Sequence, residues 1–225
     1  MATLKLLSKQ TETPEMQLLT FEKPAGFSYH SGQYVVLELA GREDKGYFAI
    51  ASHHSEPELK FLIKGDGDFA KALISLEVNN EVTCSEAQGK GFALEQLKGH
   101  NVLIITHGSG ISAMRGLAFD IAGARSEYKK VSLFYGSREV PQIPFASDFK
   151  SWQEQINCYH ALSKSLDNAD HLQATQGWVQ ILLEKHIDNA SGYRVCLVGS
   201  KEMSQEVTAL LEKKGVTKEN IFSNF

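Results

Sequence analysis

The stretch that decides the fold is VLIITHGSGIS, residues 102–112. It opens with four apolar residues in a row, which is typical of a strand buried on both faces. The glycine turn Gly108-Ser109-Gly110 follows, and Ile111 begins a segment with apolar residues at helical spacing. A backbone of this kind lets a pyrophosphate approach, and the positive end of the helix favours its charge. The same pattern also fits an ordinary tight turn, so the rest of the sequence has to decide between them.

Strands and helices alternate after this stretch. We predict buried strands over residues 131–135, 156–162 and 193–198, and helices over residues 145–155, 178–187 and 201–213. Gly215 lies just past the last of these helices, as a C-terminal cap requires. Such alternation predicts a parallel sheet with helices on both faces. We therefore assign residues 98–225 to an α/β nucleotide-binding domain.

The first part of the chain has a different pattern, with short alternating runs separated by turn residues. The predicted strands cover residues 4–7, 16–21, 34–39, 47–51, 59–63 and 81–84, with one helix over residues 68–76. Several short strands at this spacing predict a six-stranded antiparallel β-barrel over residues 1–97.

Composition and charge exclude several classes of partner. The chain has 225 residues, with 23 basic and 27 acidic side chains, so no basic field is present to attract nucleic acid or anionic lipid. No apolar run reaches the roughly 20 residues that span a bilayer, and the N-terminal residues lack the apolar core of a secretory signal. These features predict a cytoplasmic protein that does not contact a membrane.

The sequence offers no pattern of metal ligands. Cys84, Cys158 and Cys196 lie far apart, which excludes an iron-sulfur cluster held by four cysteines and a zinc site of the usual spacing. His53 and His54 are adjacent, and neighbouring side chains of an extended segment point to opposite faces. We therefore predict no metal site, and any redox chemistry requires an organic cofactor.

Four motifs, in this order and after a barrel, resemble the ferredoxin-NADP reductase superfamily. They are Gly108-Ser109-Gly110-Ile111-Ser112, Phe134-Tyr135-Gly136-Ser137-Arg138, Val198-Gly199-Ser200-Lys201-Glu202-Met203 and Asn220-Ile221-Phe222-Ser223-Asn224-Phe225. The resemblance covers nearly the whole chain. Within the superfamily, the chain is most similar to a branch of FAD/NAD-binding oxidoreductases that has plant chloroplast members.

The resemblance implies a flavoprotein that carries out electron transfer. FAD would bind to the barrel, and NADP or NAD to the second domain. Hydride would pass from the nicotinamide to FAD, and electrons would continue to an unidentified acceptor, either a protein or a small molecule.

The resemblance also implies which residues form the dinucleotide site. Thr106 and His107 would lie near the nicotinamide, and the terminal aromatic Phe225 would cover the flavin, which makes these three the candidate catalytic residues. The dinucleotide-binding candidates are Gly108, Ser109, Gly110, Ile111, Ser137, Arg138, Gly199, Ser200 and Met203. Arg138 matches a position where an arginine pairs with a 2′-phosphate, which favours NADPH. A structural salt bridge explains this arginine about as well.

The flavin site departs from the family pattern. The family motif Arg-x-Tyr-Ser falls on Gly46-Tyr47-Phe48-Ala49, which removes a countercharge to the FAD pyrophosphate and two hydroxyl groups. The flavin-binding candidates that remain are Tyr47, Phe48, Ala49, Ile50, Gly67, Phe69, Ala70, Gly89 and Lys90. Asp68 would repel a phosphate, so we predict that it caps the following helix. Val198 stands where the family has a cysteine, and we predict that Cys196 packs in the core.

Two functions remain open. The first is an NAD(P)H-dependent flavin oxidoreductase. The second is a degenerate member that binds a nucleotide as a sensor or docking subunit without catalysis, which the altered flavin motif motivates. A flavin-free short-chain dehydrogenase is excluded because no tyrosine has a lysine four residues further on.

Overall fold

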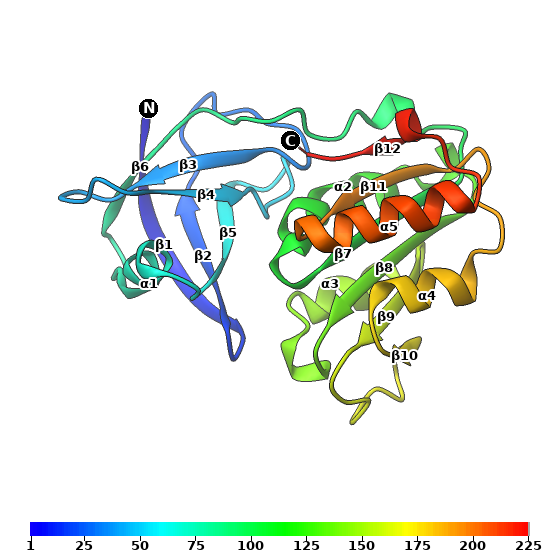
Figure 1. The fold of residues 1–225 in the computed structure, drawn as a ribbon. Coiled ribbons are helices and arrows are strands. Elements are labelled where there is room, and N and C mark those ends of the chain that lie inside the picture. Colours follow the sequence, from blue (N-terminus) through cyan, green and yellow to red (C-terminus); the bar gives the residue numbers. More distant parts are fainter. Residues whose placement is uncertain (225) are drawn as a thin grey trace.

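Six antiparallel strands form the N-terminal sheet of the computed structural model, which describes residues 1–224 (Figure 1). The strands are β1 (Ala2–Thr13), β2 (Met16–Glu22), β3 (Tyr34–Glu38), β4 (Lys45–Ala49), β5 (Glu58–Lys64) and β6 (Glu81–Cys84). Their order in the sheet is β4-β3-β6-β1-β2-β5. The N–H of Ala51 donates to the carbonyl oxygen of Lys60 at 2.8 Å and so joins the chain beyond β4 to β5. The sheet thereby closes, and the predicted antiparallel barrel is confirmed.

Alternation along these strands fills the barrel interior. Leu4, Leu6, Phe21 and Phe61 are fully buried, and the rings of Phe21 and Phe61 meet edge to face with centroids 5.8 Å apart. Burial of a side chain of this size stabilises the fold by about 1.5–3 kcal/mol. Helix α1 (Asp68–Ser75) packs its buried residues against this core.

Strand β1 is longer than its apolar pattern predicts. Its second half pairs with β2, but the side chains of residues 7–11 are exposed, so no alternation marks this part as a strand. The hairpin between β1 and β2 reaches the second domain, where the N–H of Phe145 donates to Glu12 at 2.9 Å.

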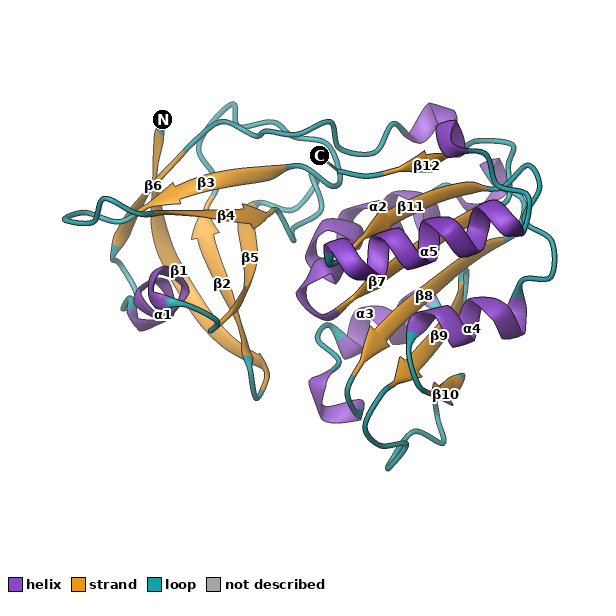
Figure 2. Ribbon diagram, in the orientation of Figure 1, coloured by secondary structure: helices purple, strands orange, loops and turns teal. Residues whose placement is uncertain are grey.

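The second sheet is parallel throughout, with the order β10-β9-β8-β7-β11-β12. Its strands are β7 (Val102–His107), β8 (Val131–Ser137), β9 (Asn157–Leu162), β10 (Ala174–Gln176), β11 (Arg194–Val198) and β12 (Ile221–Phe222). Helices α2 (Ile111–Gly123) and α3 (Ala146–Trp152) cover one face, while α4 (Val179–His186) and α5 (Lys201–Lys213) cover the other (Figure 2). The predicted α/β domain is therefore confirmed. The sequence did not predict β10 and β12, because strands of three and two residues are too short to show a period.

An apolar core joins the barrel to the α2 face of the parallel sheet. Leu18, Leu62 and Phe92 of the first domain belong to the same cluster of buried side chains as Ile111 and Met114 of α2. The start of α2 is therefore held close to the outer surface of the barrel.

Short 3₁₀ helices complete the fold, namely η1 (Leu94–Gln96), η2 (Gly108–Gly110), η3 (Arg125–Glu127), η4 (Val140–Gln142) and η5 (Lys218–Asn220). Over residues 1–224, no helix is both long enough and apolar enough to cross a membrane. The three cysteines are free and buried.

Candidate functional site

The glycine turn lies where β7 ends and α2 begins, as predicted. Gly108 has a φ of +53°, in the region that favours glycine, and a Cβ there would meet no atom within 4 Å. At Gly110, in contrast, a Cβ would lie 2.5 Å from Oγ1 of Thr106 and 3.3 Å from the carbonyl oxygen of Val198. No side chain caps α2 or the 3₁₀ turn η2 before it, and the N–H of Ile111 already donates to the carbonyl oxygens of Gly108 and Ser109. The N–H groups that face an anion here are therefore those at the start of the glycine turn itself.

The ends of β7 and β11 bring together several residues that the resemblance assigned to the nicotinamide end. Thr106 pairs with Val198 across the two parallel strands. The N–H of Ser200 donates to Nε2 of His107 at 3.0 Å, and a Cβ on Gly199 would lie 2.9 Å from the His107 ring. Burial, together with the charge of Lys64, lowers the pKa of His107, in keeping with a neutral ring that accepts this hydrogen bond.

Two further residues of this group have defined local roles. Oγ of Ser200 accepts a hydrogen bond from the N–H of Met203 at 3.3 Å and thereby caps α5. Thr106 is fully buried, and its Oγ1 has no hydrogen-bond partner among residues 1–224. A buried hydroxyl without a partner is costly, and it lies here beside the glycine turn. Cys196, below this edge, is fully buried as predicted, and burial raises the pKa of its thiol.

The residues predicted to contact the adenosine half of the dinucleotide lie at the end of β8. Oγ of Ser137 donates to the carbonyl oxygen of Gln142 at 3.1 Å. The guanidinium of Arg138 forms a salt bridge with Glu15 at 3.1 Å and remains 61% exposed. Arg138 therefore binds a residue of the β1–β2 hairpin. This contact is the structural salt bridge that the sequence allowed as an alternative to a 2′-phosphate contact.

A pocket of about 640 Å³ lies between the barrel and the glycine turn. Its lining residues are Asp44, Gly46, Tyr47, Phe48, Leu62, Lys64, Asp66, Gly67, Asp68, Phe69, Ala70 and Ser109. Five predicted flavin candidates belong to this set, namely Tyr47, Phe48, Gly67, Phe69 and Ala70. Ser109 comes from the glycine turn of the second domain. The structure therefore places residues of the predicted flavin motif and of the glycine turn in the lining of one pocket.

Gly46 has no room for a side chain. A Cβ at this position would lie 2.3 Å from the ring of Phe48 and 2.5 Å from the ring of Phe69. These two rings stack with centroids 6.2 Å apart and an interplanar angle of 28°. The space next to Gly46, where the family motif has an arginine, is thus filled by two aromatic rings.

The charges around the pocket are mainly acidic. Asp44, Asp66 and Asp68 line it, and Lys64 is the one basic residue in the lining. Lys64 already binds Asp66 at 2.7 Å. The prediction that Asp68 caps α1 is wrong, because the N-cap position is held by Gly67, which has no side chain that could cap the helix. Asp68 instead lies in the first turn of the helix, where a carboxylate still interacts favourably with the helix dipole.

Other predicted site residues lie outside this pocket. Ile50 and Ile111 are buried in the barrel core and in the interface core, respectively, and Ala49 pairs with Tyr34 in the sheet. The loop with Gly89 and Lys90 lies near the C-terminus, since a Cβ on Gly89 would lie 2.7 Å from the backbone oxygen of Asn224. Phe225, the predicted flavin cover, lies outside the described residues.

The interface between the domains contains polar residues that sequence reasoning missed. Arg115 of α2 donates to Glu56 and to Asp148, each at 2.6 Å, and to the carbonyl oxygen of Ala51 at 2.9 Å. The sequence gives one indication that Arg115 is buried at an interface. Arg115 lies four residues after Ile111 and so on the apolar face of the predicted helix.

His53 and His54 also contribute to this interface, and the prediction that they point to opposite faces is wrong. The N–H of Glu56 donates to the carbonyl oxygen of His53 at 2.9 Å, so residues 53–56 form a turn rather than an extended strand. The two imidazole rings lie side by side with centroids 4.0 Å apart, and both contact Asp120 of α2.

Comparison with known families supports this geometry. Residues 104–209 match the family described as the oxidoreductase NAD-binding domain. The matched range begins in β7 and ends in α5, so it includes the glycine turn and the ends of β8 and β11.

Curated relatives extend the similarity into the barrel. Fruit protein pKIWI502 of Actinidia deliciosa is 29% identical in an alignment of 187 positions that covers 78% of this chain and 58% of that protein. The reductase component of propane 2-monooxygenase from Gordonia sp. is 26% identical in an alignment of 232 positions, gaps included, that covers 98% of this chain and 66% of that one. Sulfhydrogenase 2 subunit gamma of Pyrococcus furiosus is 22% identical in an alignment of 180 positions that covers 78% of this chain and 61% of that subunit. The chain thus spans less than two thirds of each of these relatives.

Solved structures share the fold over nearly the whole chain. A ferredoxin NADP⁺ reductase from Neisseria gonorrhoeae with bound FAD and NADP has a TM-score of 0.85 and 14% identity, covering 100% of this chain and 98% of that one. An Amycolatopsis cytochrome P450 reductase has a TM-score of 0.87 and 15% identity, covering 99% of this chain and 69% of that one. The chain thus has the two-domain fold of these reductases, and its residues 104–209 are similar to an oxidoreductase NAD-binding domain.

Proposed function

We propose that this chain is an NAD(P)H-dependent flavin oxidoreductase that passes electrons from a nicotinamide dinucleotide through FAD to an acceptor protein or small molecule. The observation that carries the proposal is the pocket in which Phe48 of the barrel and Ser109 of the glycine turn form one lining. Both cofactors of such a reaction must meet at one place, and this pocket joins the two motifs. The named relatives that are reductase components support the same reaction class.

The residues at the glycine turn fit a dinucleotide. The N–H groups at the start of the glycine turn, which no side chain caps, would bind the pyrophosphate, and the open space at Gly108 lets it approach the backbone. Thr106 has a buried hydroxyl without a partner, which would orient the nicotinamide end through a hydrogen bond. His107, held neutral by burial, would exclude water beside it without adding a charge.

The pocket also fits a flavin ring, although it is built differently from the family pattern. The rings of Phe48 and Phe69 provide an aromatic wall, and the open backbone at Gly67 leads to the N-terminus of α1. When bound, FAD accepts hydride and releases electrons to the acceptor. Asp68 opposes the pyrophosphate, whereas Asp44 and Asp66 are paired with Arg42 and Lys64. We therefore expect weaker FAD binding than in a barrel with an arginine at position 46.

Three remaining expectations belong to this proposal. We place the domain boundary between residues 97 and 98, within the segment that connects β6 to β7. We place the protein in the cytoplasm, in keeping with its three free and buried cysteines. Gly89 and Lys90, beside the C-terminus, are proposed to contact the cofactor from that side.

A second function is favoured by the same acidic pocket. A chain that binds the dinucleotide but not FAD would act as a sensor or docking subunit. The observation that favours it is the charge of the lining within residues 1–224: its lysine, Lys64, is already paired with Asp66, while Asp68 adds a negative charge.

An FAD-binding experiment separates the two functions. The purified protein is incubated with excess FAD, desalted, and examined by visible absorption. A reductase retains close to one FAD per chain, and the variant Phe48→Leu binds it about two- to tenfold more weakly, because ring stacking is worth about 0.5–1.5 kcal/mol. Phe27→Leu is the matched control: Phe27 is also a partly buried barrel phenylalanine with a ring neighbour 6.1 Å away, but it lies outside the pocket. Protein that stays colourless and is stabilised against heat by NADPH would support the sensor instead.

A further inference from the structure

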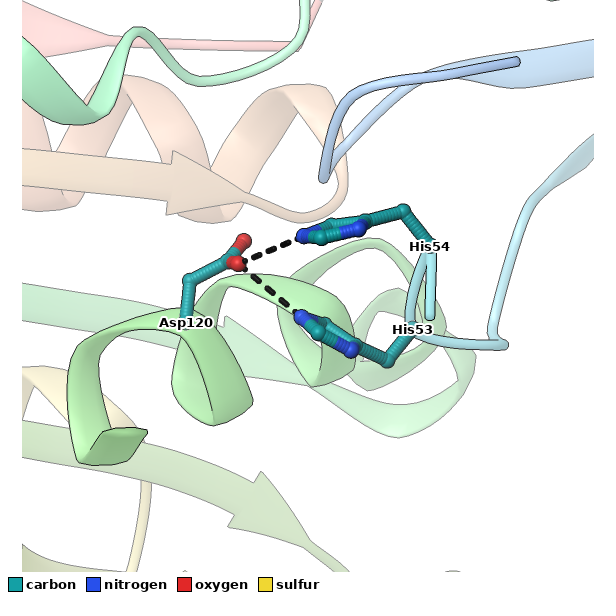
Figure 3. A group of neighbouring side chains, drawn as sticks. All are labelled: His53, His54 and Asp120. Carbon is teal, nitrogen blue, oxygen red and sulfur yellow. Dashed lines mark hydrogen bonds and ion pairs between the residues drawn. The ribbon is translucent and has the colours of Figure 1, made fainter. Parts of the chain in front are cut away.

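His53, His54 and Asp120 direct three ligand atoms at one point between the two domains (Figure 3). Nε2 of His53 lies 2.9 Å and Nε2 of His54 lies 3.1 Å from the same oxygen, Oδ1 of Asp120. The three atoms all lie within 4.8 Å of one another. The histidines belong to the turn after β4, whereas Asp120 belongs to α2.

We propose that these three side chains bind a divalent cation of the zinc class, which bridges the barrel and helix α2. Imidazole nitrogens combined with one carboxylate oxygen suit Zn²⁺, Co²⁺ or Ni²⁺, whereas Mg²⁺ and Ca²⁺ favour sites built from oxygen atoms alone. The site is separate from the cofactor pocket, since none of the three residues lines it. The proposal reverses the expectation from the sequence that the chain has no metal site.

The distances suit this coordination. Bonds of about 2.0–2.1 Å place the ligand atoms of a tetrahedral ion about 3.3 Å apart. The two nitrogen-to-oxygen distances, 2.9 and 3.1 Å, are within a few tenths of an ångström of this value. The two histidine nitrogens lie within 4.8 Å of each other, so side-chain rotation must adjust their separation as the ion binds. Three protein ligands leave a fourth position for water.

A second layer of hydrogen bonds fixes the ligands, as is usual around metal ions. Oγ of Ser31 donates to Oδ2 of Asp120 at 2.5 Å, which leaves Oδ1 to face the histidines. Nδ1 of His53 lies 2.6 Å from Oγ of Ser55. The N–H of Ser55 also donates to this Nδ1, at a longer distance of 3.4 Å. When Nε2 gives its lone pair to the ion, the ring proton moves to Nδ1, where the hydroxyl of Ser55 accepts the hydrogen bond in place of the longer backbone contact.

The backbone around the site is equally constrained. A Cβ on Gly116 would lie 2.6 Å from Oγ of Ser31, so the glycine lets α2 approach the barrel closely enough for Ser31 to reach Asp120. The carbonyl oxygen of His53 accepts a hydrogen bond from the hydroxyl of Tyr29 at 3.0 Å.

Access and burial are also suitable for an ion. The side chain of His54 is 49% exposed, which gives an entry path from solvent. The side chains of His53 and Asp120 are 18% and 9% exposed, so they hold the ion at the edge of the interface rather than in bulk water.

The test measures Zn²⁺ binding to the full chain after treatment with EDTA and removal of the chelator. Calorimetry should show one Zn²⁺ per chain, with at least tenfold weaker binding by His54→Asn and by Asp120→Asn. Because His54 is half exposed, its replacement leaves the fold intact even if Asp120→Asn does not fold. His171→Asn removes an exposed histidine elsewhere and should bind Zn²⁺ as the unchanged protein does.

A second measurement addresses the bridge between the domains. Zn²⁺ should raise the melting temperature of the unchanged chain and of His171→Asn, but not that of His54→Asn, because an ion bound only to the folded protein stabilises it. Absence of Zn²⁺ binding by the unchanged chain, or equal affinity in His54→Asn, would overturn the proposal. Neither result would affect the proposed reductase function, which is tested through FAD.

Discussion

At the scale of single residues, the proposed dinucleotide end of the site contains glycines that allow close approach. Gly110 lies against Thr106 and Val198, and Gly199 lies against His107 and Met203. Neither Gly110 nor Gly199 has a positive φ angle. Glycine is needed at these two positions because neighbouring atoms leave no room for a Cβ. The sequence could therefore identify them only through their motifs.

Replacement of Gly110 tests this close approach. The Cβ of Gly110→Ala would lie 2.5 Å from Oγ1 of Thr106, so the turn must shift and its N–H groups lose their alignment. We expect NADPH and NADH to bind at least tenfold more weakly, a loss of about 1.4 kcal/mol in fluorescence titrations. Gly123→Ala, at the other end of α2, meets no atom within 4 Å and should leave the affinity unchanged. Equal affinities in the two variants would show that the dinucleotide binds elsewhere.

The salt bridge between Arg138 and Glu15 bears on the choice between NADPH and NADH. In Glu15→Gln, the guanidinium loses its partner at 3.1 Å and becomes free to pair with a 2′-phosphate. We expect the ratio of kcat/KM for NADPH to that for NADH to rise severalfold. Glu22→Gln, which removes another carboxylate from the same hairpin, is the control. An unchanged ratio in Glu15→Gln would mean that Arg138 does not face the nucleotide.

At the scale of secondary-structure elements, strong periodicity made most of the fold predictable. The four long parallel strands and α2 each bury a continuous apolar face, and this pattern is visible in the sequence. Elements without such a face were not predictable. The second half of β1 is exposed, and β12 is held by its pairing with β11 rather than by its own residues.

Strand β9 carries a buried histidine with a consequence for stability. His160 is fully buried between aromatic rings, and its two ring nitrogens have no hydrogen-bond partner within residues 1–224. Burial, with a small contribution from His171, lowers the pKa of His160 from 6.5 to about 4.

The sign of the pH effect follows from this shift. Between pH 6.5 and about 4, the unfolded chain binds a proton at His160 that the folded protein does not. The stability is therefore fully present above pH 6.5 and falls as the pH decreases, by roughly 3 kcal/mol in total. His160→Phe should weaken this dependence in urea unfolding at pH 7.5 and pH 4.5, whereas His30→Asn, at an exposed position, should not. The same pH dependence in all three proteins would contradict the assignment.

At the scale of the whole molecule, the two domains are joined by an apolar core and by buried charge. Arg115 is the centre of the charged part, because it binds Glu56 of the barrel and Asp148 of α3 while its side chain is 11% exposed. Residues of this kind were not predictable, since their partners lie 59 and 33 positions away in the chain. The motifs that were predictable, such as Gly108-Ser109-Gly110, depend mainly on their local sequence.

Removal of the Arg115 side-chain charge tests how strongly the domains are coupled. Arg115→Met leaves Asp148 without its cationic partner, while Glu56 still binds Lys60. We expect the free energy of unfolding to fall by about 3 kcal/mol. Arg42 and Asp44 form an exposed ion pair at 2.7 Å, a distance close to those of the Arg115 pairs. Arg42→Met breaks this exposed pair and should change the free energy of unfolding little. Urea unfolding of both variants provides the comparison, and equal stabilities would show that the interface charges do not hold the domains together.

Anaerobic reduction of the flavin-loaded protein tests the central claim most directly. The protein is loaded with FAD, desalted under nitrogen, and mixed with NADPH or NADH while its visible absorption is recorded. The proposed function predicts that the flavin absorption bleaches with at least one of the two dinucleotides, and that Gly110→Ala slows this reaction. Retained FAD whose absorption does not change with either dinucleotide would contradict the claim that hydride passes across this pocket.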